Sequence, residues 1–237
     1  MSLSIIIPTY HEEAYLGKTL EAVYQRAAGP TPEVIVVDCG SVDQTVAVAR
    51  QFPTVVIEDA LLRGSKWKSL NRGAAIAQGE TLLFLDADCL VPDQFDQAIQ
   101  RCLQETNVVG GAFEFAFDER GVAYQVITLI NRVRYRFSHR FYGDQGIFVS
   151  STIFDQVGGW PALDLMEAAY FCQNLQQHGK LRLVSKPLHT STRRFVEGGI
   201  IRVFLFDLGV WWLDVLGLDV QRLAKAYWQQ NERRGKK

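Results

Sequence analysis

Two aspartates one residue apart, Asp86 and Asp88, come directly after the apolar run of residues 82–85. In a dry site, two carboxylates this close repel each other unless a cation or a proton intervenes. Carboxylate oxygens are the ligands that Mg²⁺ and Mn²⁺ prefer, and in proteins these ions typically bridge to a phosphate group. The pair therefore predicts a metal site at the end of a buried strand, with Asp88 and Asp86 among its ligands.

Two further apolar runs also end in polar residues. Residues 4–8 lead into the segment 9–12, and a second run ends at Asp38 before the segment 39–43. Ligands of open parallel sheets bind beyond the carboxyl ends of the strands, so we expect these segments to lie at one edge of the sheet with Asp86. Asp43 is explained equally well as the cap of the helix that follows it. No GxGxxG or Walker-type GxxxxGK pattern follows the first strand, which argues against a dinucleotide oxidoreductase and a P-loop ATPase.

The elements that must position these residues alternate along the first half of the chain. Short β-branched runs predict strands over residues 4–8, 33–38, 54–58 and 81–86. Helical periodicity separates them, with a third helix over residues 65–77 and a fourth that has Pro92 in its first turn. This alternation is typical of an α/β protein with a mostly parallel, doubly wound central sheet flanked by helices.

The regular alternation of predicted strands and helices weakens after Gly110 and Gly111. The pattern there predicts strands over residues 113–117, 147–149 and 181–184, and helices over residues 124–141 and 167–177. The chain of 237 residues is long enough for one large α/β domain.

The amino-acid composition limits which classes of molecule we expect the chain to bind. The formal net charge is −1 and 48% of the residues are hydrophobic, so the chain has no electrostatic footprint for nucleic acid. The four cysteines are widely separated and show no CxxC spacing, which indicates reduced thiols in a cytoplasmic protein. We therefore expect a folded cytoplasmic protein with a small-molecule substrate.

The most apolar segment, residues 200–218, has the length of a membrane span but contains Arg202, Asp207 and Asp214. Three central charges cost roughly 8 to 10 kcal/mol on the insertion scale, and the apolar residues return only about 4 to 7 kcal/mol, so a spanning helix is not expected. Asp207, Asp214 and Gln221 recur every seven residues and form a narrow polar stripe. The expected helix packs on its own domain, on a second copy in a homodimer, or peripherally on the inner face of the membrane.

Four segments of the first half resemble, in order and spacing, the nucleotide-binding half of family 2 glycosyltransferases: residues 5–13, 36–45, 71–73 and 85–88. The second half is similar to the branch of that family associated with arsenosugar-type biosynthesis, through residues 143–146, 158–160, 165–167 and 190–194. The resemblance implies a GT-A fold in a single domain of residues 1–237. In it, residues 1–110 form the donor half, residues 111–198 the acceptor half and residues 199–232 an apolar helical segment.

The resemblance also implies a role for individual residues. The base and ribose of the donor would be lined by Pro8, Tyr10 and Glu12, while Asp38 would hydrogen-bond the base and Lys68 would approach base or phosphate. The donor site would also include Ser41 and Asp86, and the diphosphate would be steadied by Arg193 and Arg194. The metal ligands would be Asp88, Asp86 and His189, and the acceptor would be bound by Gly143, Gln145, Gly159 and Trp160. A structural role for His189 and a solvated basic turn at residues 193–194 are the alternatives.

The chain departs from the family pattern at the acceptor. Family members usually carry a Glu-Asp pair at the start of a helix, and the aspartate accepts the proton of the acceptor hydroxyl. This chain has Glu167 followed by Ala168. Glu167 is the expected replacement, with Asp144 or Asp164 as alternatives, because inverting transfer needs a carboxylate within hydrogen-bond reach of the attacking hydroxyl.

The predicted function is therefore an inverting, metal-dependent hexosyl transfer with Mg²⁺ or Mn²⁺. The donor would be a nucleoside-diphosphate sugar, with a UDP-sugar favoured, and the acceptor hydroxyl belongs to a molecule that the sequence does not name. The alternative is a nucleotide-sugar-binding protein of weak or no catalytic activity, as the alanine at position 168 suggests. A nucleotidyltransferase is less well supported, since the basic glycine-rich loop of that class is absent from the start of the chain.

Overall fold

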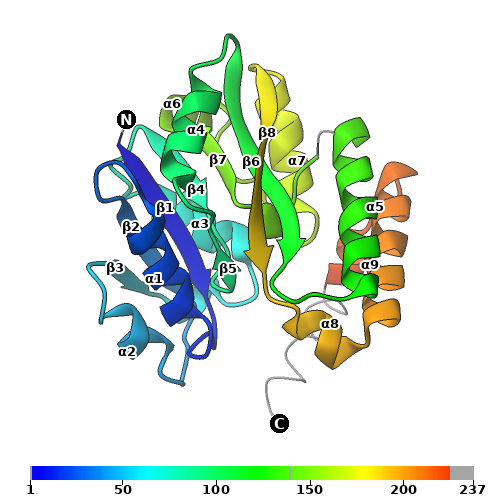
Figure 1. The fold of residues 1–237 in the computed structure, drawn as a ribbon, viewed down its shortest axis with the longest axis horizontal. Coiled ribbons are helices and arrows are strands. Elements are labelled where there is room, and N and C mark those ends of the chain that lie inside the picture. The colour runs from blue at the N-terminus through cyan, green and yellow to red at the C-terminus, as the bar shows by residue number, and fades with distance from the viewer. Residues whose placement is uncertain (1, 139, 225–237) are drawn as a thin grey trace.

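A computed structural model describes residues 2–138 and 140–224 of the protein, and its centre is an eight-stranded sheet (Figure 1). The strands are β1 (Leu3–Thr9), β2 (Glu33–Asp38), β3 (Val55–Glu58), β4 (Thr81–Phe84), β5 (Cys89–Leu90), β6 (Val108–Phe117), β7 (Ile147–Ser150) and β8 (Lys180–Thr190). The α-helices are α1 (Leu16–Arg26), α2 (Thr45–Ala49), α3 (Lys66–Ala74), α4 (Phe95–Leu103), α5 (Val122–Ser138), α6 (Ser151–Gln156), α7 (Glu167–Gln176), α8 (Arg193–Gly198) and α9 (Ile200–Val215). Two 3₁₀ turns, η1 (Ala60–Leu62) and η2 (Gly143–Gln145), complete the described elements.

The strand order is β3-β2-β1-β4-β7-β6-β8-β5. The first four strands in this order are parallel to one another, as the sequence predicts. β7 is antiparallel to both β4 and β6, while β8 is parallel to β6. The predicted α/β fold with a mostly parallel sheet is confirmed, and the parallel half directs the carboxyl ends of β1, β2 and β4 to one edge.

The sheet separates two apolar layers. Successive side chains of a strand point to opposite faces, so Ile5 and Ile7 of β1 pack with α1 and α4, whereas Ile6 packs on the other face with α3 and α7. Helices therefore cover both faces of β1, β2 and β4, which is why these strands read as continuous apolar runs, whereas the edge strand β3 is partly exposed.

Several element boundaries differ from the sequence prediction; β8, for example, runs to Thr190, whereas the predicted strand ends at residue 184. Helix α4 begins at Phe95, after Gln94 in a left-handed conformation, so Pro92 precedes the helix instead of lying in its first turn. Strand β6 begins at Val108 and contains Gly110 and Gly111, where the predicted strand had not yet begun. A Cβ atom on Gly111 would lie 2.1 Å from the carbonyl oxygen of Arg182. Glycine is therefore used here for close approach of two strands, and it does not interrupt the strand.

Helix α9 turns its polar stripe toward the protein. Asp214 accepts hydrogen bonds from Arg140 (2.7 Å) and from the hydroxyl of Tyr170 (2.9 Å), and Asp207 pairs with Arg194 at 2.5 Å. The helix predicted over residues 200–218 thus packs on its own chain, and it ends at Val215; residues 225–232 of the predicted segment lie outside the described residues. In the described part of the chain, none of the helices has both the length and the apolar character needed to cross a bilayer.

Candidate donor and catalytic site

Asp86 and Asp88 lie just beyond the end of β4, at the edge predicted from the sequence. Asp86 forms an ion pair with Lys66, the first residue of α3, with 2.5 Å between Nζ and Oδ1. Burial lowers the pKa of Lys66, but the carboxylates of Asp86, Glu167 and Asp144 outweigh that effect, and the pKa rises above its ordinary value. Lys66 is thus a fixed positive charge among several carboxylates.

Asp88 is joined to the loop after β1 through Arg193. The Arg193 Nε lies 3.1 Å from Asp88 Oδ2, and its two terminal nitrogens each donate to a carboxylate oxygen of Glu12 at 2.6 Å. The guanidinium also stacks 4.5 Å from the centre of the Tyr15 ring. Burial raises the pKa of Glu12 to about 7, against the lowering effect of Arg193, and burial also raises the pKa of Asp88. Arg193 therefore bridges two elements that both belong to the predicted donor site.

Asp38, the last residue of β2, forms hydrogen bonds that order the loop after this strand. Its carboxylate accepts hydrogen bonds from the backbone of Gly40 (3.0 Å) and Ser41 (2.8 Å), and from the hydroxyls of Ser41 (2.5 Å) and Thr9 (3.1 Å). Only 2% of Asp38 is exposed. The Ser41 hydroxyl in turn accepts from the backbone of His11 at 2.9 Å. Asp38 and Ser41 thus shape the donor loops from within, and their direct contact with a base stays a prediction.

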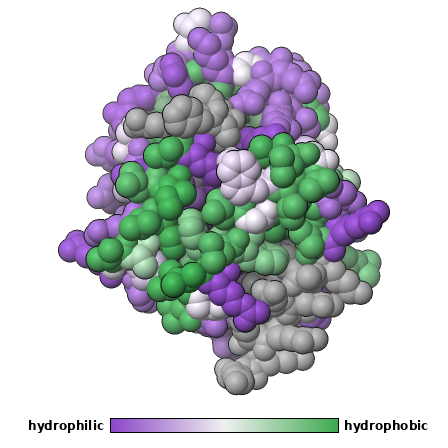
Figure 2. All heavy atoms as spheres, turned by 90° about the vertical axis from the view of Figure 1, so that its right-hand side faces the viewer, coloured by the Kyte–Doolittle hydropathy of each residue, from purple (hydrophilic) through white to green (hydrophobic). Residues whose placement is uncertain are grey.

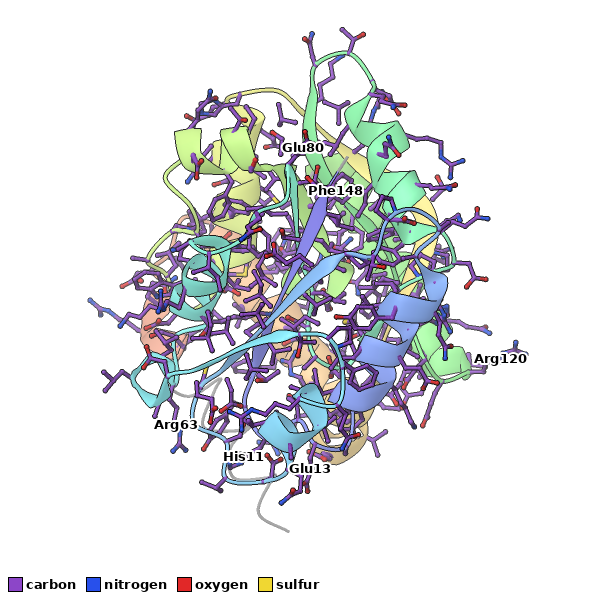
Figure 3. All side chains as sticks on the ribbon, turned by 90° about the vertical axis from the view of Figure 1, so that its left-hand side faces the viewer. His11, Glu13, Arg63, Glu80, Arg120 and Phe148 are labelled. Atoms are coloured by element: carbon purple, nitrogen blue, oxygen red, sulfur yellow. The ribbon has the colours of Figure 1, made fainter. Side chains whose placement is uncertain are left out.

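The loops after β1 and β3 meet at the same end of the molecule, where Figure 3 shows His11, Glu13 and Arg63, while Glu80 lies at the opposite end of the sheet. The Tyr10 ring stacks on His11 with 4.1 Å between ring centres, and the Arg63 guanidinium lies 4.5 Å from the Tyr10 ring. Pro8 lies near the end of β1, and Tyr10 is the first residue after this strand. The predicted base-binding residues are therefore gathered at one end of the parallel strands.

Lys68, which the sequence analysis placed at the donor, is exposed, and its Nζ lies 5.4 Å from the ring of the neighbouring Trp67. The lysine that enters the site is Lys66. On a helix, Lys66 shares a face with the buried Leu70 and Gly73, four and seven residues further on, whereas Lys68 lies on another face. This spacing is the sequence signal that could have identified Lys66.

On the acceptor side, Gly143 and Asp144 of η2 border the Lys66–Asp86 pair. A Cβ on Gly143 would lie 2.6 Å from Lys66 Nζ, so a side chain there would have to displace the end of Lys66 from its pair with Asp86. Burial and the nearby Asp86 raise the pKa of Asp144 to about 6. Among the residues that the structure describes, Asp144 Oδ1 is buried and has no hydrogen-bond partner.

Glu167 begins α7 and is 8% exposed. Burial raises its pKa, and Lys66 acts in the opposite direction. Asp164, the third carboxylate considered for proton transfer, is exposed and accepts hydrogen bonds from Ser65 and Trp67 at 3.3 Å each. Asp144, whose Oδ1 is buried, and the buried Glu167 thus share Lys66 with Asp86.

Gln145 and Trp160, predicted to bind the acceptor, have well-defined structural partners. Gln145 is fully buried, and its amide accepts from the Tyr142 backbone (3.0 Å) and donates to the Phe113 carbonyl (3.1 Å). Trp160 is 3% exposed, and its ring stacks on Phe171 with 4.3 Å between ring centres. Both side chains support the site from the core.

Gly159 brings the backbone before Trp160 against Asn71. A Cβ on Gly159 would lie 2.6 Å from Asn71 Oδ1, and the Asn71 amide exchanges two hydrogen bonds with the backbone of Trp160. The motif residues 71–73 and 158–160, far apart in sequence, thus meet in the structure. Direct contacts of Gly143, Gln145, Gly159 and Trp160 with an acceptor stay predictions.

The remaining predicted donor and metal residues, Arg194 and His189, are also engaged. Arg194 pairs with Asp207 of α9, and His189 Nδ1 lies 3.0 Å from the carbonyl oxygen of Phe117. No group of three or more His, Cys, Asp or Glu side chains within the described ranges is arranged to hold a metal ion by itself. A metal ligand role of His189 stays a prediction.

The donor set nevertheless fits a hard divalent cation at Asp86 and Asp88. Both side chains offer carboxylate oxygens, and burial holds the pKa of Asp88 above its ordinary value. A cation would offset the cost of burying this charge. Two carboxylates leave most of the coordination sphere to water and phosphate oxygens, as is usual for Mg²⁺.

A mostly parallel α/β sheet with carboxylates and basic groups at its strand ends fits the class of nucleotide-sugar transferases with a GT-A fold. Residues 4–159 match the family described as Glycosyl transferase family 2, and the chain belongs to this family. Glu167 and Arg193 lie beyond the matched residues, so the part of the chain outside the match supplies two of the charged groups of the site.

Glycosyltransferase AglE of Haloferax volcanii is 31% identical over 171 residues, which cover 67% of this chain and 56% of AglE. The chain therefore spans little more than half the length of this relative. The resemblance of the second half to the arsenosugar-type branch stays a prediction.

Solved structures share the fold at lower identity. Glucosyl-3-phosphoglycerate synthase of Mycobacterium tuberculosis, crystallised with Mn²⁺, UDP and glucosyl-3-phosphoglycerate, superposes with a TM-score of 0.65 at 18% identity, over 92% of this chain and 80% of that chain. Residues 1–349 of S. aureus TarS, in complex with UDP, give a TM-score of 0.61 at 19% identity, over 81% of this chain and 60% of that chain. These structures establish the GT-A fold of the chain.

Proposed function

We propose that the protein transfers a sugar from a nucleoside-diphosphate sugar, with a UDP-sugar favoured, to an acceptor hydroxyl, with inversion at the anomeric carbon and dependence on Mg²⁺ or Mn²⁺. The observation that carries the proposal is the charged cluster beyond β4, in which Asp86 pairs with Lys66 and Asp88 with Arg193. The two similar structures that hold UDP, one of them with Mn²⁺, support the same nucleotide and metal class.

Asp88 and Asp86 would hold the cation. When bound, the cation offsets the negative charge that grows on the departing nucleoside diphosphate. Lys66 and Arg193 are the basic groups of the same cluster, and both can donate charge-assisted hydrogen bonds to phosphate oxygens. Glu12 anchors Arg193 with two hydrogen bonds and so keeps its guanidinium beside Asp88.

Asp144 is the group that we propose as acceptor of the hydroxyl proton, in preference to Glu167. Its Oδ1 is buried without a hydrogen-bond partner in the described structure, and its pKa of about 6 leaves it mostly ionised at neutral pH yet basic enough to take a proton. Glu167, which the sequence predicts as the proton acceptor, would then interact electrostatically with Lys66 on the acceptor side.

The two carboxylates can be separated by kinetics. Asp144→Asn should lower kcat by about 10² or more, the usual contribution of a general base, and should remove the rise in rate around pH 6. Glu167→Gln should leave that rise in place. A variant Glu167→Gln that loses the pH dependence, with Asp144→Asn retaining it, would reverse the assignment.

Transfer itself is tested with Asp88→Asn. UDP-sugar hydrolysis or transfer should require Mn²⁺ or Mg²⁺ and fall to background in this variant. Asp93→Asn is the matched control, because Asp93 is an exposed aspartate after β5 whose contact with Arg26 is 3.7 Å long. Equal rates in Asp88→Asn and wild type would remove the proposed function.

A nucleotide-sugar-binding protein without transfer is the second candidate, because position 168 carries no carboxylate and Ala168 is packed in the apolar layer below the sheet. If the wild type binds UDP-sugars but transfers nothing to water or acceptor, Ala168→Asp tests this candidate. Activity gained in Ala168→Asp and absent from Ala168→Asn would show that only the missing carboxylate prevents transfer.

A further inference from the structure

Helices α5 and α9 present a broad apolar surface to solvent, shown in green in Figure 2. We call it the α5–α9 face. Its exposed side chains are Val122, Val126, Leu129, Ile130 and Val133 on α5, with Ile201, Leu205, Trp212, Val215, Leu216 and Leu218 on and just after α9. The two helices are neighbours, since the Arg134 guanidinium of α5 lies 5.9 Å from the Trp211 ring of α9. Contiguous exposed apolar surfaces of this kind mark sites of association.

The orientation of α9 is fixed by its acids. Asp214 is 5% exposed and bound by Arg140 and Tyr170, and Asp207 is paired with Arg194. Rotating the helix to bury Leu205 would break these contacts and carry the buried Asp214 carboxylate away from its partners, which is strongly destabilising. The chain therefore holds its polar stripe inward and its apolar stripe outward.

Helix α5 shows the same arrangement. Its exposed apolar residues follow a spacing of three, four and seven residues, which places them on one stripe. Tyr124, Ile127 and Tyr135, on the other side of the helix, are buried in the core. The two outward stripes lie side by side and together make one face.

Residues 225–237, which follow the described part of the chain, are rich in basic residues. Their sequence contains five basic residues, one acidic residue and only three that are apolar or aromatic, Ala226, Tyr227 and Trp228. They follow Ala224, which packs with Val210 of α9 in the same apolar cluster. Arg202 of α9 is exposed, as is Arg222, which pairs with Asp219 at 3.4 Å. Among the described residues, the face thus carries the exposed Trp212 and is bordered by Arg202 and Arg222.

Apolar side chains bordered by basic residues and tryptophan are the composition that binds the interface of an anionic bilayer. We infer that the α5–α9 face docks peripherally on an anionic lipid surface. Leu165 and Met166, which precede Glu167, pack in the same apolar cluster as Val210. Docking would therefore bring the acceptor side of the site close to the membrane.

The test uses the full chain and two kinds of vesicle, one of phosphatidylcholine alone and one with phosphatidylglycerol added. Flotation should recover the protein with the anionic vesicles. Replacement of two exposed leucines, Leu129→Ser with Leu205→Ser, should weaken this binding about tenfold or more, because each removes apolar area from the contact. These positions are 62% and 59% exposed, so the fold should persist, as circular dichroism can verify.

Leu61→Ser is the matched control, since Leu61 is 89% exposed on η1, away from the α5–α9 face. It should bind anionic vesicles as the wild type does. No flotation of the wild type, or equal flotation of the double variant, would overturn the inference. A stable dimer that ignores vesicles and becomes monomeric in the double variant would instead assign the face to a second copy of the chain. UDP binding is measured in parallel, so failure here is distinct from failure of the proposed function.

Discussion

At the scale of single residues, Lys66 interacts with more of the charged groups of the site than its sequence position suggests. It is the positive charge shared by Asp86, Glu167 and Asp144, and it lies two residues before the lysine that the family resemblance singled out. Lys68, in contrast, is exposed. The two lysines differ in the helix face that they occupy and not in chemistry.

We predict that Lys66→Met weakens UDP binding roughly tenfold or more, the effect of one lost charge-assisted hydrogen bond, when measured calorimetrically with Mn²⁺. Lys68→Met is the matched control and should change the affinity less than about twofold, because an exposed side chain remote from the cluster makes no such bond. The opposite ranking of the two variants would place Lys68 at the donor, as first predicted.

Asp144 links the chemistry to stability. Burial raises its pKa from 3.8 to about 6, so the folded chain binds a proton that the unfolded chain has released across this window. The stability of the wild type therefore falls as the pH rises from about 4 to 6, because the unfolded state binds fewer protons.

Asp144→Asn cannot ionise, and it should be more stable than wild type by about 1 to 3 kcal/mol at pH 7.5, with little difference at pH 4. Urea denaturation at both pH values measures this difference. A variant that is less stable than wild type at pH 7.5 would show that the charged carboxylate has a partner, and it would weaken the case for Asp144 as the free base.

At the scale of elements, the contact between α3 and the turn before α7 holds the acceptor side to the donor side. Asn71 donates to the Trp160 carbonyl (3.0 Å) and accepts from its backbone nitrogen (2.8 Å). Lys66, at the start of the same helix, faces Asp86. Loosening this contact should therefore act on stability and on the site together.

Asn71→Ala should lower the free energy of unfolding by about 1 to 3 kcal/mol, because it leaves two backbone groups of a nearly buried turn without partners. Gln25→Ala removes an exposed amide that bonds only to Glu21 one turn earlier, and it should stay within about 0.5 kcal/mol of wild type. Chemical denaturation compares the two. Equal effects of both substitutions would mean that the Asn71 contact is not what joins these elements.

The sequence predicts the positions of the strands better than it predicts which strands lie next to each other. The apolar runs predicted β1, β2 and β4, which are buried on both faces, and a β-branched run predicted the partly exposed edge strand β3. It could not predict that β7 enters antiparallel beside β4, because strand order is a property of the chain's path and not of its local pattern. Residue types at the end of β4 predicted Asp86 and Asp88 at the edge of the sheet, where they lie.

The partners of those residues come from distant segments. Arg193 meets Glu12 across 181 positions of the sequence, and no spacing rule anticipates that pair. The resemblance implies donor contacts for both residues, which stay predictions, and it does not anticipate their contact with each other. The seven-residue spacing of Asp207 and Asp214 predicts that both lie on one stripe of a helix. That this stripe faces the protein depends on the positions of Arg194 and Arg140, which no local pattern predicts.

At the scale of the whole molecule, the parallel strands and the elements that follow them contribute different parts of one site. The parallel strands β1, β2 and β4 end at a single edge of the sheet (Figure 1), and the segments that follow them contain the predicted donor residues and the two aspartates. The later elements bring Asp144, Glu167 and Arg193 to the same cluster. On the outer side, α5 and α9 form the apolar face that we assign to a lipid surface.

The central claim is that Asp88 and Asp86 bind the diphosphate of a nucleotide through a divalent cation. Calorimetric titration of UDP in Mn²⁺ and in EDTA tests it most directly, with wild type, Asp88→Asn and the control Asp93→Asn side by side. The structure predicts binding that needs Mn²⁺, is lost in Asp88→Asn and is unchanged in Asp93→Asn. UDP binding of equal strength in EDTA, or in Asp88→Asn with Mn²⁺, would contradict it.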